Sequence, residues 1–139
     1  VHDLDLSGIP LDDRLGPALA ALPGRKVIYT NATNKHAHRV LGHLGIMQHF
    51  EGFFDIIDAE FIPKPNQQPY EVLLRRHGID PSQAVMVEDI AKNLVPAANL
   101  GLATVWVRGG RDIELTDDQA DCVDHVIDDL TAWMVSLHS

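Results

Sequence analysis

Short apolar runs alternate with amphipathic segments along most of this chain. Four runs are typical of strands that are buried on both faces, and a fifth at 123–127 is weaker. The strong runs are Lys26–Thr30, Phe53–Ile57, Ala84–Glu88 and Ala103–Val107. Segments with apolar residues three or four positions apart lie around them and predict helices. These segments are Leu11–Leu22, Lys35–Leu44, Gln68–His77, Ile90–Leu100 and Leu130–Leu137.

This alternation predicts the fold class. Strands followed by helices, with short connections, favour right-handed crossovers and therefore a parallel sheet with helices on both faces. We expect an α/β fold, a Rossmann-like three-layer sandwich with a mostly parallel sheet, in one domain over residues 1–139. Gly78 and Gly101 follow two predicted helices, where glycine is a common stop. Ligands of such sheets bind at the carboxyl ends of the strands, so the residues there are the candidates for chemistry.

The composition excludes several classes of protein. The chain has 139 residues, of which 45% are hydrophobic and 22% charged. These are values of a globular domain and not of a disordered chain or a coiled coil. No apolar run approaches the ~18 residues of a membrane helix, and no signal-peptide pattern is present. Cys122 is the only cysteine, which suits a reducing compartment, so we expect a cytoplasmic protein that does not enter a membrane.

The charge is unevenly distributed. Eleven Lys and Arg residues stand against twenty Asp and Glu residues, a formal net charge of −9. Eight of the acids lie between positions 112 and 129, and no Lys or Arg follows Arg111. We expect this segment to be a solvated acidic face. Binding to a nucleic acid polymer is disfavoured because it needs a basic surface, whereas one local phosphate pocket is compatible with the charge.

The first predicted strand ends in Thr30 and Asn31. A hydroxyl and an amide at the start of a helix can donate hydrogen bonds to an anion, together with the free backbone N–H groups of the helix. Asn31, Thr33 or Asn34 can instead cap the helix, which is the more frequent use of such residues. Thr30 and Asn31 are therefore candidates for phosphate binding, with helix capping as the alternative.

The second predicted strand leads to Lys64, which stands between Pro63 and Pro65. Both prolines favour an extended and rigid backbone at this lysine. A lysine that is held in this way at the start of a helix suits the neutralisation of a phosphate or a charged nucleophile. The ordinary alternative is a solvated lysine in a loop. Asn66 is expected to cap the helix that follows.

The third predicted strand ends in two adjacent carboxylates, Glu88 and Asp89, and Asn93 follows four residues later. Two neighbouring carboxylates repel each other unless a cation lies nearby. Oxygen ligands with a phosphate partner suit Mg²⁺, although Asp89 alone could simply cap a helix. The carboxyl ends of parallel strands share one edge of the sheet. We therefore expect Thr30, Lys64 and the Glu-Asp pair to converge there.

Taken together in this order, the motifs resemble the haloacid dehalogenase superfamily of phosphohydrolases, in its pyrimidine 5′-nucleotidase branch. Four segments carry the resemblance: Val27–Asn31, Lys64-Pro65 with Tyr70 six residues after the lysine, Val85–Leu94, and Ala98–Val105. The resemblance implies Mg²⁺-dependent hydrolysis of small phosphate monoesters, pyrimidine nucleotides among them, through an aspartyl phosphate. Its partners would be a small phosphorylated metabolite or a nucleotide monophosphate.

The same resemblance implies a role for each candidate residue. Thr30 and Asn31 would bind the transferring phosphoryl group, and Lys64 would stabilise the charge of the nucleophile and the phosphate. Thr30 and Lys64 are thus the catalytic candidates of this chain. Asp89 would bind Mg²⁺ directly or through water. Glu88 and Asn93 would orient the ligands of the metal.

The chain departs from the family at its beginning. The family's first motif is an apolar strand followed by Asp-x-Asp-x-Thr, which carries the nucleophile, and a cap domain follows it. Only 25 residues precede Lys26. Asp3-Leu4-Asp5-Leu6-Ser7 has the spacing of the motif, but only Val1-His2 precede it, so Asp3 as the nucleophile is the less favoured alternative. We therefore expect the C-terminal part of a core domain, incomplete at its N-terminus and without nucleophile or cap. A non-catalytic phosphate-binding or assembly module is the alternative. A signalling receiver domain is disfavoured because its acids, Thr and Lys come in another order.

The missing strand of the resemblance would lie at the centre of the sheet, between the strands that end in Thr30 and Glu88. An empty place there would hold those two strands about 10 Å apart with unpaired backbone groups. A separate N-terminal piece or a homo-oligomer partner is expected to supply the strand. The alternatives are closure of the two neighbours, or entry of Val1–Leu6, which carries two charges and is poorly suited to a buried strand.

Overall fold

The computed structural model describes residues 2–3, 15–21, 24–33, 35–36, 38–39, 42 and 45–137. Its strands are β1 (His2–Asp3), β2 (Val27–Tyr29), β3 (Gly52–Phe54), β4 (Val85–Glu88), β5 (Ala103–Val107) and β6 (His125–Ile127). The α-helices are α1 (Leu15–Ala21), α3 (Gln67–Arg76), α4 (Val95–Asn99), α5 (Asp117–Asp121) and α6 (Leu130–Ser136). Short 3-10 helices are η2 (Met47–His49), η3 (Pro81–Gln83) and η4 (Ala91–Leu94).

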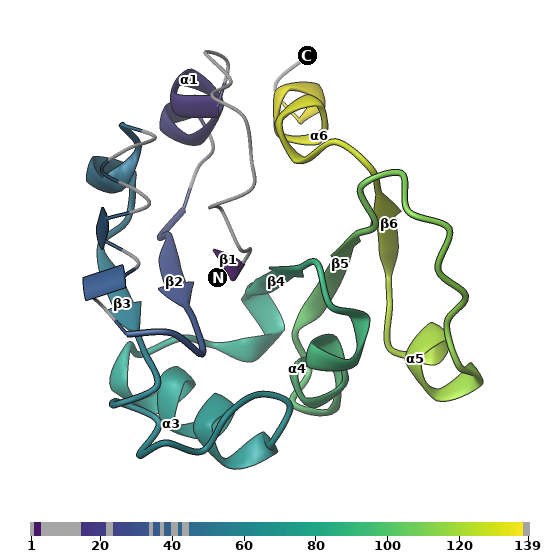
Figure 1. Cartoon of the computed structure of the whole chain (residues 1–139), viewed down its shortest axis with the longest axis horizontal. Helices are drawn as coiled ribbons and strands as arrows, with labels where there is room; N and C mark the ends of the chain where they lie inside the picture. Colours follow the sequence, from purple (N-terminus) through teal and green to yellow (C-terminus); the bar gives the residue numbers. More distant parts are fainter. Residues whose placement is uncertain are drawn as a thin grey trace.

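The described strands form one sheet in the order β3-β2-β1-β4-β5-β6, and every pair of neighbours is parallel. Helices α1 and α6 cover one face of this sheet, whereas α3 and α4 cover the other (Figure 1). This arrangement confirms the predicted α/β three-layer fold. It also brings the carboxyl ends of all strands to the same edge, because every strand runs in the same direction.

The core has two sides because successive side chains of a strand point to opposite faces of the sheet. On one side Tyr29, Met86 and Trp106 pack in a cluster with Tyr70 and Leu73 of α3. On the other side Ile28 packs with Ala18 and Leu19 of α1 and Met134 of α6, while Val87, Val105 and Val107 form a neighbouring cluster. Strands β2, β4 and β5 therefore carry buried apolar side chains on both faces of the sheet.

The predicted helix stops are confirmed, but one predicted helix is divided. Gly78 and Gly101 have φ values of 60° and 95°, in the left-handed region that favours glycine. The segment Ile90–Leu100 consists of η4 followed by α4, with Pro96 in the first turn of α4. Proline has no backbone N–H to donate to the preceding turn, so the regular helix starts only there.

The second predicted strand is shorter than expected and ends at Phe54. The backbone N–H of Asp55 donates to Asp58 Oδ2, at 3.0 Å, and that of Asp58 donates to Asp55 Oδ1, at 2.9 Å. This reciprocal pair turns the chain directly after Phe54 and ends its pairing with β2. Parts of the predicted helices Leu11–Leu22 and Lys35–Leu44 lie outside the described residues.

The central place of the sheet is occupied by β1. His2 pairs with Ile28 on one side and with Val87 on the other, and Asp3 pairs with Glu88. The expectation that a separate piece or a partner chain fills this place is therefore wrong for this structure, because the chain's own N-terminus enters the gap. The reason is that unpaired backbone groups on β2 and β4 would cost more free energy than placing a short polar segment between them.

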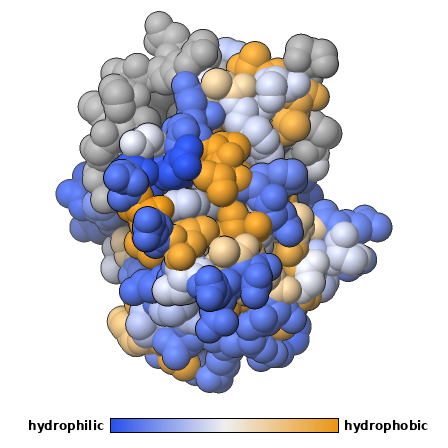
Figure 2. Space-filling model, turned by 90° about the vertical axis from the view of Figure 1, so that its right-hand side faces the viewer, coloured by the Kyte–Doolittle hydropathy of each residue, from blue (hydrophilic) through white to orange (hydrophobic). Residues whose placement is uncertain are grey.

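The face that carries β6 shows hydrophobic residues gathered in its middle and hydrophilic residues around them (Figure 2). Val126 of β6 is 46% exposed.

The acidic residues between positions 112 and 129 are all exposed, as expected for a solvated face. Among the described residues, no helix is long and apolar enough to cross a membrane.

Candidate active site

A buried ion pair joins the second and third candidate motifs. Lys64 Nζ lies 2.9 Å from Glu88 Oε2, and each of these side chains is 1% exposed. The same ammonium group donates to the carbonyl oxygen of Tyr29, at 3.4 Å, and lies 4.8 Å from the centre of the Tyr29 ring. Lys64 therefore ties the end of β2 to the end of β4. The alternative of a solvated lysine in a loop is wrong.

Burial dominates the electrostatics of this pair. It raises the pKa of Glu88 to about 7; Lys64 opposes the shift, and Asp89 adds to it. Burial also lowers the pKa of Lys64, whereas the charges of Glu88 and Asp89 oppose that change. A dry site thus disfavours both charges, and each is retained chiefly by the attraction of the other. An anion that entered here would meet an ammonium group already stripped of water.

Thr30 and Asn31 follow β2 directly, and Asn31 contacts the backbone of Lys64. Thr30 Oγ1 accepts a hydrogen bond from the backbone N–H of Ala32, at 3.0 Å, and keeps its own proton for donation. Asn31 Oδ1 accepts from the backbone N–H of Lys64, at 2.9 Å, across 33 residues. The hydrogen bond that caps the next helical residues comes from another side chain, because Thr33 Oγ1 accepts from His36 N–H at 3.3 Å. Asn31 thus fixes the loop that carries Lys64.

Both carboxylate oxygens of Glu88 have partners. Oε2 accepts from Lys64, and Oε1 accepts from the backbone N–H of Ile90, at 3.2 Å. The next residue, Asp89, is only partly buried. Asn93 is 3% exposed, and its backbone carbonyl accepts a hydrogen bond from the Tyr70 hydroxyl. Within the described part of the chain, Asn93 Oδ1 and the Tyr29 hydroxyl are the buried side-chain polar atoms without a partner.

The oxygen atoms of Asp89 and Asn93 suit Mg²⁺ as ligands. This ion usually binds one or two carboxylates and keeps several waters and substrate oxygens as ligands. Asp89 offers a partly exposed carboxylate, and Asn93 offers an oxygen without a partner, so the donor set fits. Glu88 is committed to Lys64, which agrees with an orienting role. Among the residues that the structure describes, no group of three His, Cys, Asp or Glu residues that could hold a metal is found.

Asn66 precedes α3 as predicted but does not cap it with its side chain. Its Nδ2 donates to the carbonyl of Pro63 instead, at 2.7 Å, so it closes the turn that carries Lys64.

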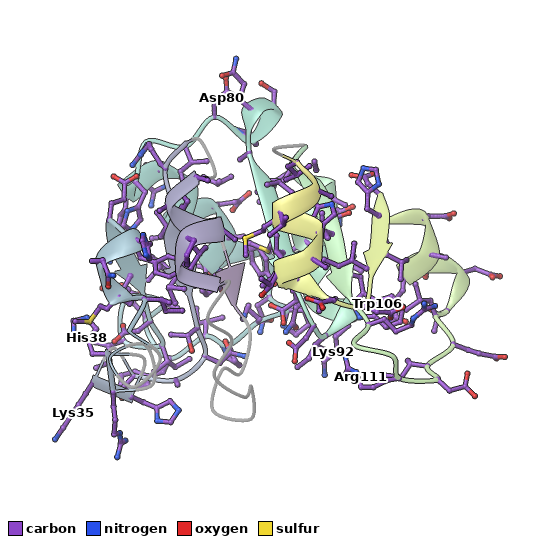
Figure 3. All side chains as sticks on the ribbon, turned by 90° about the horizontal axis from the view of Figure 1, so that it is seen from above. Lys35, His38, Asp80, Lys92, Trp106 and Arg111 are labelled. Carbon is purple, nitrogen blue, oxygen red and sulfur yellow. The ribbon has the colours of Figure 1, made fainter. Side chains whose placement is uncertain are left out.

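Sequence reasoning missed two residues that hold the end of β4. The carbonyl oxygen of Asp89 accepts from Trp106 Nε1, at 2.9 Å, and from Arg111 Nη2, at 2.7 Å. Trp106 and Arg111 lie with Lys92 along one edge of the molecule, and Asp80 lies at the opposite edge (Figure 3). The register pairs Glu88 with Trp106 on the neighbouring strand. The strand register places the indole beside the acids, and no pattern of consecutive residues specifies it.

Comparisons with known proteins identify the family of this chain. A family model of haloacid dehalogenase-like hydrolases matches residues 4–101. The chain belongs to the haloacid dehalogenase-like hydrolase family. The superfamily part of the resemblance is thereby confirmed, whereas the pyrimidine 5′-nucleotidase branch stays a prediction. Asp3 lies just outside the matched range.

One curated relative is a phosphatase, and solved structures with the same fold include a phosphatase and a dehalogenase. The chain is 31% identical over 84 residues to a glyceraldehyde 3-phosphate phosphatase of Pyrococcus furiosus; the match covers 58% of this chain and 35% of that protein. A predicted phosphoglycolate phosphatase of Haemophilus somnus superposes with a TM-score of 0.73 at 23% identity, over 96% of this chain and 60% of the other. The L-2-haloacid dehalogenase of Xanthobacter autotrophicus with chloropropionic acid covalently bound superposes with a TM-score of 0.70 at 18% identity. That match covers 89% of this chain and 59% of the other. The chain thus spans about a third of the curated relative and some three fifths of these two structures.

Proposed function

We propose that this edge of the sheet binds the phosphoryl group of a small phosphate monoester together with Mg²⁺, as part of a phosphohydrolase. Pyrimidine nucleoside monophosphates are the proposed substrates. The observation that carries the proposal is the buried Lys64–Glu88 pair beside Thr30, because a desolvated lysine next to a hydroxyl donor is a strong site for a phosphate. The family and its phosphatase relative support this choice of chemistry.

Each residue has a defined task in the proposed reaction. The Thr30 hydroxyl donates to a phosphoryl oxygen, and the Lys64 ammonium offsets the charge that builds up on the phosphate. Asn31 keeps the Lys64 loop against β2. Mg²⁺ held by Asp89 would supply further charge neutralisation.

The nucleophile of the proposed reaction is a carboxylate. It attacks phosphorus, the ester oxygen leaves, and water then hydrolyses the resulting aspartyl phosphate. Within this chain the backbone of Asp3 lies at the end of the central strand, in register with Glu88. Asp3 is therefore the residue to test for this task, although it lies outside the range that the family model matches.

Isothermal titration calorimetry with inorganic phosphate and Mg²⁺ tests the site without requiring turnover. We expect measurable heats for the parent chain and their loss in Lys64→Met and Asp89→Asn. Asp80→Asn is the matched control, because Asp80 lies at the opposite edge of the sheet and asparagine can still accept the hydrogen bond from Ser82 N–H. Equal heats in the parent chain, Lys64→Met and Asp89→Asn would contradict the proposed site.

Phosphate release from uridine monophosphate and from glyceraldehyde 3-phosphate tests the substrate class. Without a covalent nucleophile we expect negligible release of phosphate, because loss of that path removes many powers of ten in rate. Robust Mg²⁺-dependent release that disappears in Asp3→Asn would make Asp3 the nucleophile. Release from the triose phosphate alone would replace the nucleotide assignment.

A further inference from the structure

Asp89 lies directly after β4, at the point where the ladder of backbone hydrogen bonds between the strands ends. Its carbonyl oxygen nevertheless has two donors, Trp106 Nε1 at 2.9 Å and Arg111 Nη2 at 2.7 Å. Both donors come from the neighbouring strand β5 or from the loop that follows it. They fix the peptide plane between Asp89 and Ile90, and with it the direction in which the Asp89 side chain leaves the sheet.

The two donors are themselves held in place. Trp106 is 3% exposed, packs in the core and pairs with Glu88 in the sheet register. The Arg111 guanidinium also donates from Nε to the carbonyl of Arg108, at 2.7 Å, and from Nη2 to that of Val107, at 3.1 Å. Its planar fork thus ties the loop after β5 to the loop after β4, a geometry that a lysine cannot reproduce with the same donors.

We propose that Arg111 and Trp106 are positioning residues that aim the Asp89 carboxylate at a divalent cation on this edge of the sheet. The inference rests on the proposed function, which assigns the cation to Asp89. The indole and the guanidinium both donate to the Asp89 backbone carbonyl, so neither of them occupies the Asp89 carboxylate. Partners that orient a metal ligand typically contribute about 10–100-fold to metal affinity, because the ligand no longer has to be ordered when the metal binds.

A titration of the full chain with Mg²⁺ alone tests this inference. The Mg²⁺ affinity is measured from the amide chemical shifts of residues near Asp89. Arg111→Gln and Trp106→Phe are expected to bind Mg²⁺ about 10-fold more weakly than the parent chain. Arg111→Lys should recover part of the loss. Arg108→Gln is the matched control, because the Arg108 guanidinium pairs with Asp128, at 2.8 Å from both Nε and Nη2, away from the Asp89 carbonyl.

The variants separate this inference from the proposed function. If Asp89→Asn abolishes Mg²⁺ binding while Arg111→Gln and Trp106→Phe leave it unchanged, the positioning role is wrong and the metal site stands. If Asp89→Asn binds as the parent does, the metal site itself is wrong. An equal loss of affinity in Arg108→Gln would also overturn the positioning role, because it would reflect a general disturbance of the loop. Thermal unfolding without Mg²⁺ identifies variants that merely fold less well.

Discussion

At the scale of single residues, desolvation and charge attraction act against each other in the Lys64–Glu88 pair. Its geometry is good, at 2.9 Å, but both side chains are almost fully buried. Desolvating two charges costs several kcal/mol each, and only close contact and further hydrogen bonds offset this. Removing one of the two charges therefore costs more stability than replacing both by apolar side chains. Such a pair contributes little to stability, so we interpret it as a feature that serves phosphate binding.

A pH-dependent loss of stability is expected from Glu88. Its folded-state pKa of about 7 lies above the ordinary value of 4.5, so between these values the folded state holds a proton that the unfolded chain has released. The stability from this group is therefore full below pH 4.5 and is lost as the pH rises towards 7. Chemical denaturation from pH 4.5 to 7 should show the parent losing on the order of 3 kcal/mol relative to Glu88→Gln. A difference between the two proteins that does not change with pH would contradict this assignment.

At the scale of elements, helix α5 shows how a short helix forms with little apolar support. None of its residues is buried, and two aspartates occupy its first turn. Thr116 Oγ1 accepts from the backbone N–H of Gln119, at 3.2 Å, and Gln119 Oε1 accepts from that of Thr116, at 3.1 Å. This capping box satisfies two of the free donors at the start of the helix. The helix therefore depends on its cap more than on packing.

Loss of the cap should destabilise the protein modestly. Thr116→Ala removes the hydroxyl acceptor and is expected to lower the free energy of unfolding by about 1 kcal/mol. Thr116→Ser keeps the acceptor and should stay close to the parent. Equilibrium denaturation in urea measures both. Equal stability of Thr116→Ala and the parent would show that the cap contributes nothing measurable to this helix.

At the scale of the whole molecule, the two residues of β1 connect the halves of the sheet. His2 pairs with both Ile28 and Val87, so β2 and β3 on one side reach β4, β5 and β6 on the other through this short strand. Buried backbone groups left without partners each cost on the order of 1–3 kcal/mol. A short segment thus supports the edge where the strands end and the candidate site lies.

Deletion of residues 1–3 should therefore loosen the centre of the sheet. Hydrogen exchange is expected to show lower protection at Ile28 and Val87, while the β5–β6 pairing around Trp106 keeps most of its protection. Asp3→Asn retains the strand and serves as the control. Size-exclusion chromatography of the same samples shows whether a second copy of the chain fills the place instead. Unchanged protection at Ile28 and Val87 in a monomeric deletion variant would show that β1 is dispensable.

Much of the fold follows from local pattern. The run Ala103–Val107 becomes β5 with the predicted bounds, because an apolar strand buried on both faces is specified by its own residues. The Gly78 and Gly101 stops were also predictable, since a left-handed residue after a helix favours glycine. Helix α5 was missed because its sequence has no apolar period, and the end of β3 was missed because a pair of aspartates turns the chain there.

The sequence alone determined which chemical groups stand at the strand ends: Thr30, Asn31, Lys64, Glu88 and Asp89. Order along the chain and parallel strand direction were sufficient for that, because each motif is a property of consecutive residues. The tertiary structure decided that Lys64 is buried against Glu88, that Asn31 holds the Lys64 loop, and that His2–Asp3 enters the centre of the sheet. It also brought Trp106 and Arg111 to the Asp89 carbonyl. These contacts join residues 17 to 85 positions apart. They arise only when strands align in register and desolvation forces buried polar groups to find partners.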